Sequence, residues 1–254
     1  MNYVQYPFKN MRITQLPTGT TSHKPHTTGN PKDFPIDEGG KDTGREAFYC
    51  PCDEIEIRRI YGVGTKGVNT LFYRSTSVCD FADGTKGYLV GLITHSNDND
   101  LKRLRVGQKF KRGELVCYEG TDGGVGMHAH LSFGKGEFKG NGWTKNSNGK
   151  YVLYCSGGAF SPEKICFVDK SFTKIINAKG LKFKEIPKPS TKYLPCYTGK
   201  STSLVDALKA VKVDSSYTYR KKIAAANKVK FYVGTGKQNT QLLTLLKCGK
   251  CVKP

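Results

Sequence analysis

The 254-residue sequence lacks any long apolar run and any recognisable export signal. No segment approaches the roughly 18 consecutive apolar residues that a membrane-spanning helix needs, so we expect no membrane insertion. The N-terminal stretch lacks the charged start, apolar middle and small-residue cleavage site of a signal peptide. We therefore expect synthesis in a host cytoplasm, and a substrate outside it would be reached only after release or as part of a larger particle.

Acidic residues are scarce relative to basic ones. The chain has 21 Asp and Glu against 41 Lys and Arg, which leaves a formal net charge of +20. Such a field raises the rate of association with polyanions, although an unspecialised basic surface is the plain alternative. Because no helix-turn-helix, zinc-finger or RNP-like aromatic signature is present, we do not expect a nucleic-acid partner.

The nine cysteines are odd in number and do not form the two C-x-x-C pairs of a zinc ribbon. Only Cys248 and Cys251 have that spacing. We therefore expect most cysteines to be reduced, buried small side chains of a protein made in a reducing compartment. Cys50-Pro51-Cys52 is interpreted as structural on the same grounds.

Apolar and polar residues tend to alternate between Glu54 and Phe133, as in the segments 54–57, 70–74 and 87–93. This is strand periodicity, and glycine-rich turns such as 62–64 interrupt it. The gaps are too short for helical crossovers, so the pattern predicts an antiparallel sheet.

The pattern changes after residue 183. Residues 184–192 are rich in Pro and Lys and predict a semi-extended linker. Helical periodicity follows over 203–208, 219–227 and 238–247, the last closed by Gly249. The sequence thus predicts an α+β protein with an antiparallel β-sheet domain over 1–183 and a small basic helical domain over 193–254.

The sharpest chemical signal is His128-Ala129-His130. In a strand, residues i and i+2 point to the same face, so both imidazoles converge on one site. Two imidazoles with a carboxylate nearby suit Zn²⁺, whereas two polar residues on an exposed face are the alternative. All five histidines of the chain lie in its first half or just beyond it: His23, His26, His95, His128 and His130.

The surroundings of this motif resemble the lysostaphin and LytM type of zinc metalloendopeptidase, which cuts bacterial peptidoglycan. Residues 106–114 resemble the family's V-G-Q turn, and residues 120–130 resemble its G-x-T-G-x-(S/T)-G-x-H-x-H motif. Ser22-His23 and the segment 35–42 are similar to the family's first histidine and aspartate, although the usual gap of three residues is thirteen here. The resemblance covers roughly residues 12–140.

The resemblance implies that His23, Asp37 and His130 hold zinc with a fourth position open for water, and that His95 and His128 serve the chemistry. His95 matches the family's isolated middle histidine. Three protein ligands plus water is also the usual arrangement of catalytic zinc, whereas structural zinc is closed by four ligands.

Several alternatives stay open at this stage. The expanded gap leaves His26 as a rival to His23. Asp33 and Asp42 are rival carboxylates to Asp37, and we expect both on the solvated surface because Asp37 alone has the family's Pro-Ile-Asp context. Trp143 is interpreted as a core or groove-wall aromatic.

Residues 193–254 resemble a C-terminal module of clostridial and clostridial-phage wall hydrolases, which implies a wall-binding role. The sequence as a whole predicts a monomeric, zinc-dependent peptidoglycan endopeptidase, either a phage endolysin or a tail-associated lysin, with teichoic acids as a further partner. The alternative is a non-catalytic wall-binding or scaffold protein with a relic metal site.

Overall fold

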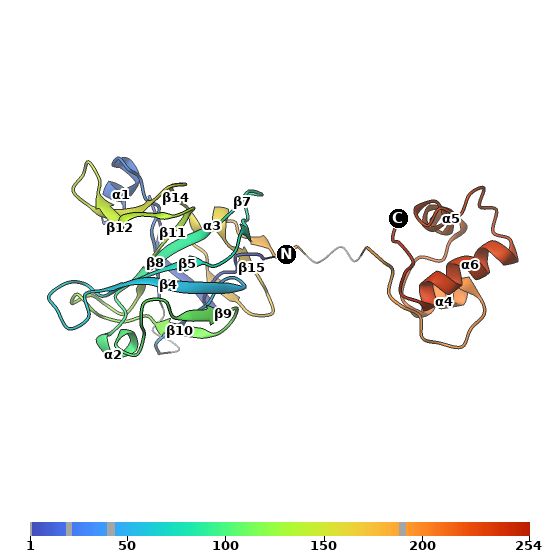
Figure 1. The fold of residues 1–254 in the computed structure, drawn as a ribbon, viewed down its shortest axis with the longest axis horizontal. Helices are drawn as coiled ribbons and strands as arrows, with labels where there is room; N and C mark the ends of the chain where they lie inside the picture. Colours follow the sequence, from blue (N-terminus) through green and yellow to red (C-terminus); the bar gives the residue numbers. More distant parts are fainter. Residues whose placement is uncertain (1, 19–21, 40–43, 188–191) are drawn as a thin grey trace. The chain divides into compact units, whose positions relative to one another are not determined.

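The computed structural model describes residues 2–18, 22–39, 44–187 and 192–254. The chain divides into residues 1–186, here unit 1, and residues 187–254, here unit 2, each with its own apolar core (Figure 1). Unit 1 is mostly β-sheet with few helices, and the described part of unit 2 contains helices and connecting loops. Asp42 and residues 188–191 of the expected linker lie outside the described residues.

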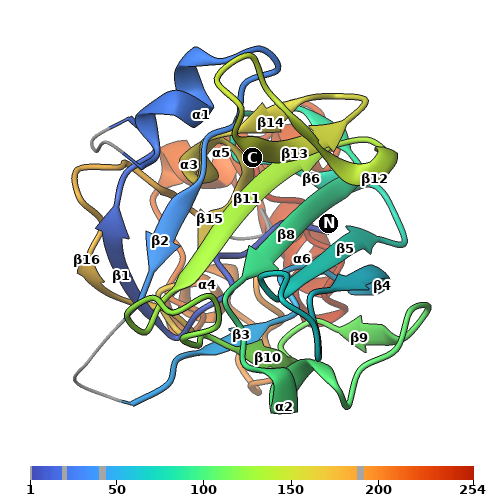
Figure 2. The ribbon, with the colours of Figure 1, turned by 90° about the vertical axis from the view of Figure 1, so that its left-hand side faces the viewer.

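One large sheet in unit 1 positions the site (Figure 2). His130 lies on β11 (Ala129–Lys135), a strand near the middle of this sheet, and His128 lies just before that strand, in an isolated bridge with Gly120. The strand order is β16-β1-β2-β11-β8-β5-β4-β9, with β14 also paired to β11. Neighbouring strands are antiparallel except β1 and β16, so the predicted antiparallel sheet is confirmed. In the described residues its strands are β1 (Asn10–Gln15), β2 (Ile36–Glu38), β4 (Glu54–Tyr61), β5 (Thr70–Ser75), β8 (Leu89–Thr94), β9 (Lys109–Lys111), β11 (Ala129–Lys135), β14 (Ala159–Phe160) and β16 (Lys174–Asn177).

The two faces of this sheet are covered differently. Leu131 and Phe133 of β11 belong to the main apolar core, and strand alternation therefore turns His130 to the opposite face. On that face a second, smaller cluster gathers Leu92 of β8 with Leu153. Leu153 lies on the hairpin formed by β12 (Phe138–Lys145) and β13 (Tyr151–Cys155). The candidate site thus lies beside this hairpin, away from the main core.

Short elements complete unit 1. Two further strand pairs are β3 (Ala47–Tyr49) with β10 (Leu115–Tyr118), and β6 (Cys79–Asp80) with β7 (Lys86–Gly87). The helices in the described part of this unit are α1 (Lys24–Thr28), α2 (Asp98–Leu101) and α3 (Pro162–Ile165).

Unit 1 ends at Ile186, within the segment 184–192 that was expected to be the linker. Strand β17 (Lys184–Glu185) pairs in parallel with β15 (Phe167–Val168), and the N–H of Ile186 donates to the carbonyl of Val168 at 3.1 Å. These backbone hydrogen bonds attach residues 184–186 to unit 1, although their composition is that of a linker.

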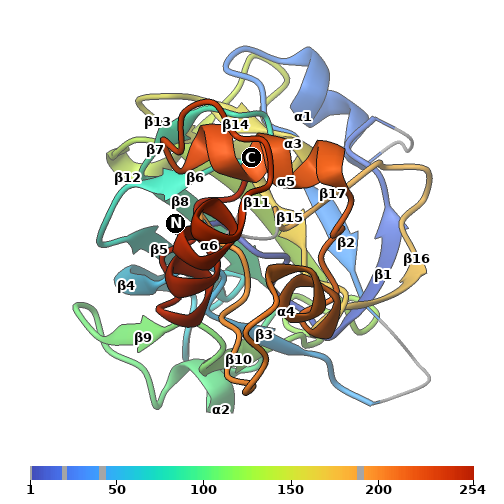
Figure 3. The ribbon, with the colours of Figure 1, turned by 90° about the vertical axis from the view of Figure 1, so that its right-hand side faces the viewer.

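In unit 2, helices α4 (Leu204–Ala210), α5 (Tyr217–Ala226) and α6 (Gly236–Lys247) pack around a core that includes Leu208, Ile223 and Leu242 (Figure 3). Each helix begins at a hydroxyl residue whose side chain accepts a backbone N–H three residues later. These N-caps are Ser203, Ser216 and Thr235. No helix among the described residues is long and apolar enough to cross a membrane.

The cysteines, all within the described residues, are free thiols. Cys50 and Cys52 are buried in the main core of unit 1, as their structural interpretation requires. In unit 2, Cys251 is buried but Cys196 and Cys248 are exposed.

Candidate metal centre

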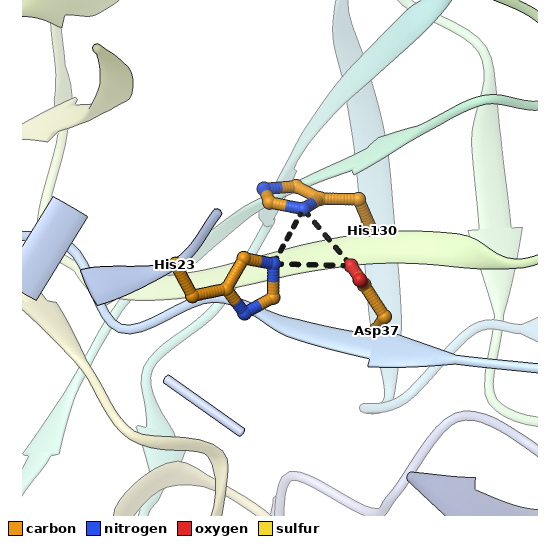
Figure 4. Close-up of side chains that lie close together, drawn as sticks. All are labelled: His23, Asp37 and His130. Carbon is orange, nitrogen blue, oxygen red and sulfur yellow. Dashed lines mark hydrogen bonds and ion pairs between the residues drawn. The ribbon is translucent and has the colours of Figure 1, made fainter. Parts of the chain in front are cut away.

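Three side chains from separate parts of unit 1 converge on one point (Figure 4). His130 Nδ1 lies 3.1 Å from Asp37 Oδ1, and His23 Nε2 lies 3.2 Å from the same oxygen. The two histidine nitrogens are 3.3 Å apart. Among the residues that the structure describes, this is the group of His, Cys, Asp and Glu side chains that could hold a metal ion.

Strand pairing and one short helix produce this convergence. Asp37 on β2 is directly opposite His130 on β11 in the antiparallel register. His23 immediately precedes α1. Pro25 lies in the first turn of this helix, where its fixed φ and missing N–H are well suited. The thirteen residues between His23 and Asp37 therefore contain a helix and the connection back to the sheet.

The donor atoms fit a tetrahedral zinc ion. Ligand atoms about 2.0–2.1 Å from such an ion lie about 3.3–3.4 Å apart, close to the three separations observed here. His23 is 2% exposed, and its Nδ1 donates to the carbonyl of Leu16 at 3.0 Å, which leaves the Nε2 lone pair facing the group. A backbone carbonyl partner of this kind is the usual way to orient a metal-binding histidine.

Asp37 remains an anion at this position. Burial alone would raise the pKa of Asp37, but the close contacts of its carboxylate with His130 and His23 outweigh burial and hold the pKa well below its usual range. The carboxylate therefore offers a charged oxygen to a cation at any pH near neutrality.

His95 and His128 lie beside this group with their ring centroids 4.5 Å apart. His95 Nδ1 is 2.8 Å from the carbonyl of Asp122, and His128 Nδ1 is 2.6 Å from the carbonyl of Gly126. A carbonyl can only accept, so in each neutral ring Nδ1 carries the hydrogen and Nε2 keeps a lone pair. Burial, partly offset by the hydrogen bond to Asp122, lowers the pKa of His95 to about 4.

Gly120 allows the two auxiliary histidines to meet. A Cβ atom at this position would lie 2.3 Å from the carbonyl oxygen of His95. Gly120 also exchanges backbone hydrogen bonds with His128, at 3.1 and 3.3 Å. His95 itself has a positive φ of 78°, a conformation that non-glycine residues adopt mainly at turns and functional sites.

The rival histidine lies close to the group but outside it. The ring centroid of His26 is 5.9 Å from that of His23 and 5.8 Å from that of His130. Burial, with His130 and His23 nearby, lowers the pKa of His26 to about 4. The structure therefore places His23 within the ligand group, whereas His26 lies close to the group but outside it.

Asp33 is not on the solvated surface, so that expectation is wrong. Its side chain is 1% exposed and accepts hydrogen bonds from Ser132 Oγ at 2.8 Å and from the N–H of Leu153 at 2.9 Å. Burial raises the pKa of Asp33. These bonds tie β11 to β13, which no local sequence pattern indicated.

An aromatic hollow of about 400 Å³ opens beside His95 and His130. Trp143, Tyr61 and Tyr151 line it, so Trp143 is a wall residue of a groove. The guanidinium of Arg59 lies 5.1 Å from the centre of the Trp143 ring and 5.2 Å from that of Tyr61, and it donates to the carbonyl of Asn141. No sequence pattern indicated Tyr61, Tyr151 or Arg59, because these residues are far apart along the chain and share no motif.

Comparison with known proteins finds phage relatives. The chain is 33% identical over 142 residues to morphogenesis protein 1 of Bacillus phage B103, covering 56% of this chain and 34% of that protein. Over 50 residues it is 50% identical to an L-alanyl-D-glutamate peptidase of Listeria phage A118, covering 20% of this chain and 18% of that protein. Over 63 residues it is 44% identical to an endolysin of Listeria phage A511, covering 25% and 18%. The chain thus spans about a third of the first relative's length and less than a fifth of the other two.

Likeness to solved structures is weak. A zinc-containing peptidase from Vibrio cholerae superimposes with a TM-score of 0.32 and 14% identity, over 52% of this chain and 36% of that one. A putative peptidase M23 from Pseudomonas aeruginosa gives a TM-score of 0.28 and 16% identity, over 59% and 51%. No family model matches the chain.

Proposed function

We propose that the protein is a zinc-dependent endopeptidase that hydrolyses peptide bonds in bacterial peptidoglycan. The convergence of His23, Asp37 and His130 carries this proposal, because their donor atoms have the types and separations that a catalytic zinc ion requires. When bound there, zinc would polarise the scissile carbonyl and make water acidic enough to lose a proton near neutral pH.

His95 and His128 are the proton carriers in this proposal. Each neutral ring directs an Nε2 lone pair away from its carbonyl partner, which suits a general base that takes a proton from the attacking water. Once protonated, the same nitrogen can donate to the developing oxyanion or to the leaving amine. His128 Nε2 lies 3.8 Å from Asp37 Oδ1, so it lies next to the position where the attacking water would bind.

The aromatic hollow beside the histidines would seat part of the substrate. It is lined by apolar and aromatic side chains next to the reactive groups, as substrate pockets usually are. The names of the two Listeria phage relatives, a peptidase and an endolysin, support a substrate in the cell wall.

Unit 2 would hold the enzyme at the wall as a monomer. Residues 193–254 contain twelve Lys and Arg against two Asp and no Glu. This charge favours anionic wall polymers such as teichoic acids, and a tethered basic unit would raise the local concentration of unit 1 at its substrate. We propose action at the wall either at lysis or from a virion.

The decisive experiment treats purified cell walls with the protein and identifies the released fragments by mass spectrometry. We expect new peptide termini, about one zinc per chain by elemental analysis, loss of cleavage after chelation and its return with zinc. Full cleavage by metal-free protein would end the proposal. A zinc-loaded protein that binds walls but releases nothing would favour the alternative, a non-catalytic wall protein with a relic site.

A further inference from the structure

Unit 2 presents two apolar side chains to solvent on the loop between α5 and α6. Phe231 is 91% exposed and Val233 is 67% exposed. Phe231 also has a φ of 50°, in the left-handed region that bulky residues rarely adopt. Two such side chains on one short loop form a candidate contact surface.

The side chain of Gln238 holds this loop in place from one side. The Gln238 amide oxygen accepts from three consecutive backbone N–H groups, and its amide nitrogen donates to two backbone carbonyls. The partners are the N–H groups of Val233, Gly234 and Thr235 and the carbonyls of Lys230 and Phe231, at 3.0–3.4 Å. The loop is therefore built to display Phe231.

Tyr232, between the two exposed residues, anchors the loop from the other side. It is 5% exposed, and its hydroxyl donates to Asn239 Oδ1 at 2.5 Å and accepts from Arg220 Nη1 at 3.0 Å. Tyr232 thus packs into unit 2, while its neighbours Phe231 and Val233 point outward. Folding alone does not require these two apolar side chains to be exposed.

The exposed ring borders a basic hollow of about 500 Å³. Lys221, Lys228 and Lys230 line it together with Phe231 and Val233, and none of the described residues that line it is acidic. We call this the Phe231 hollow. A ligand there would meet positive charge and an apolar ring side by side.

We propose that the Phe231 hollow binds a phosphate-linked polyol or sugar polymer of the cell wall, the teichoic acid class. The lysines would pair with successive phosphates, and Phe231 would pack on the carbon backbone between them. The inference rests on the proposed function only in placing the protein at the wall.

An anionic bilayer is the other surface with this chemistry. The polymer is favoured because the lysines line the same concave hollow as the ring. A flexible chain can enter this hollow and meet the charges and the ring together, and binding to anionic vesicles tests the bilayer directly.

The test uses the full chain and the Phe231→Asn variant, since Asn tolerates a positive φ and removes only the ring. Binding is measured to purified poly(glycerol phosphate), to intact walls, to walls stripped of phosphodiester-linked polymers by hydrofluoric acid, and to phosphatidylglycerol vesicles. We expect Phe231→Asn and the double variant Lys228→Ala/Lys230→Ala each to weaken polymer binding at least about fivefold. The lysine variant should also flatten the salt dependence.

Two matched controls isolate the hollow. Lys212→Ala removes a lysine from a different hollow of unit 2, and Ile175→Ala removes an exposed apolar side chain from unit 1. Both should bind as the parent protein does. Unchanged binding by Phe231→Asn, equal binding to stripped walls, or a Phe231 dependence confined to phosphatidylglycerol vesicles would overturn the inference.

Cleavage of a soluble wall peptide, measured in parallel, separates this inference from the proposed function. Phe231→Asn should cleave as fast as the parent protein. If no protein cleaves, the peptidase proposal fails while the polymer-binding result stands by itself.

Discussion

His130 Nδ1 lies 3.1 Å from Asp37 Oδ1 because the two residues occupy directly opposed positions on β11 and β2. This strand register brings Asp37 and His130 of the candidate metal site together, and only His23 comes from outside the sheet. The site contains two kinds of histidine. His23 and His130 lie within the ligand group, and His95 and His128 lie beside it. Those two kinds should respond differently to mutation.

Removing either sheet ligand should abolish metal binding and activity together. For Asp37→Ala and His130→Ala we expect zinc content to fall from about one per chain towards zero, and wall cleavage to fall at least about a hundredfold. Elemental analysis and fragment release are measured on the same preparations. Asp53→Ala, at an exposed carboxylate, is the control and should retain both. Retention of zinc by Asp37→Ala would remove Asp37 from the ligand set.

His23 and His26 should separate in the same assay. His23 Nε2 lies within 3.3 Å of both other donor atoms, so His23→Ala should lose zinc. His26→Ala should keep zinc, because the His26 ring of the parent protein lies outside the ligand group. The opposite pattern would show that the ring of His26 replaces that of His23 when metal binds.

The auxiliary histidines should affect catalysis without removing the metal. We expect His95→Ala and His128→Ala to retain most of the zinc and to lose about 10²–10⁴-fold in rate, the usual contribution of a general acid or base. Zinc content and the cleavage rate of a soluble wall peptide test this. If His128→Ala loses the metal while His130→Ala keeps it, the strand-face assignment is reversed.

Glu38, next to Asp37, should give the stability of unit 1 a pH dependence. It is fully buried, contacts the Tyr6 hydroxyl and accepts from the N–H of Arg12 at 2.6 Å. Burial raises the pKa of Glu38 from 4.5 to about 8. The folded protein therefore keeps a proton that the unfolded chain releases above pH 4.5, so the contribution of Glu38 to stability falls as pH rises from 4.5 to 8.

The measurement is urea unfolding at several pH values with chelator present throughout, so that metal binding adds no pH dependence. Glu38→Gln keeps a neutral side chain of the same shape. Relative to this variant, the parent protein should lose up to about 1.4 kcal/mol per pH unit within that window. Parallel pH profiles for the two proteins would contradict the prediction.

Separating the two units should separate cleavage from residence at the wall. A fragment ending at Ile186 contains the whole described β-sheet of unit 1. We expect it to cleave soluble wall peptides at the parent rate but to clear intact cells at least about tenfold more slowly, since it loses the tethered basic unit. Equal clearing by fragment and full chain would argue against a targeting role for unit 2.

Local chemistry explains what could be predicted of the site. The two-residue period of a strand places His128 and His130 on one side whatever the rest of the chain does. The alternation between 54 and 133 likewise predicts the antiparallel sheet, because burying one face selects that pairing. These features depend on neighbours in sequence and need no tertiary information.

Residues close together along the chain account for the strand and helix periodicity, the H-x-H pair and the excess of positive charge. Which distant groups meet depends on the folded chain: Asp37 and not Asp33 lies opposite His130, His23 and not His26 lies within reach, and Trp143 shares one wall with Tyr61. The reason is that a period or a cap is set within a few residues, whereas a register between strands depends on the packing of the whole sheet. Asp33 and Asp37 are both acidic residues of one short segment, and only strand pairing turns one towards the histidines and buries the other against Ser132.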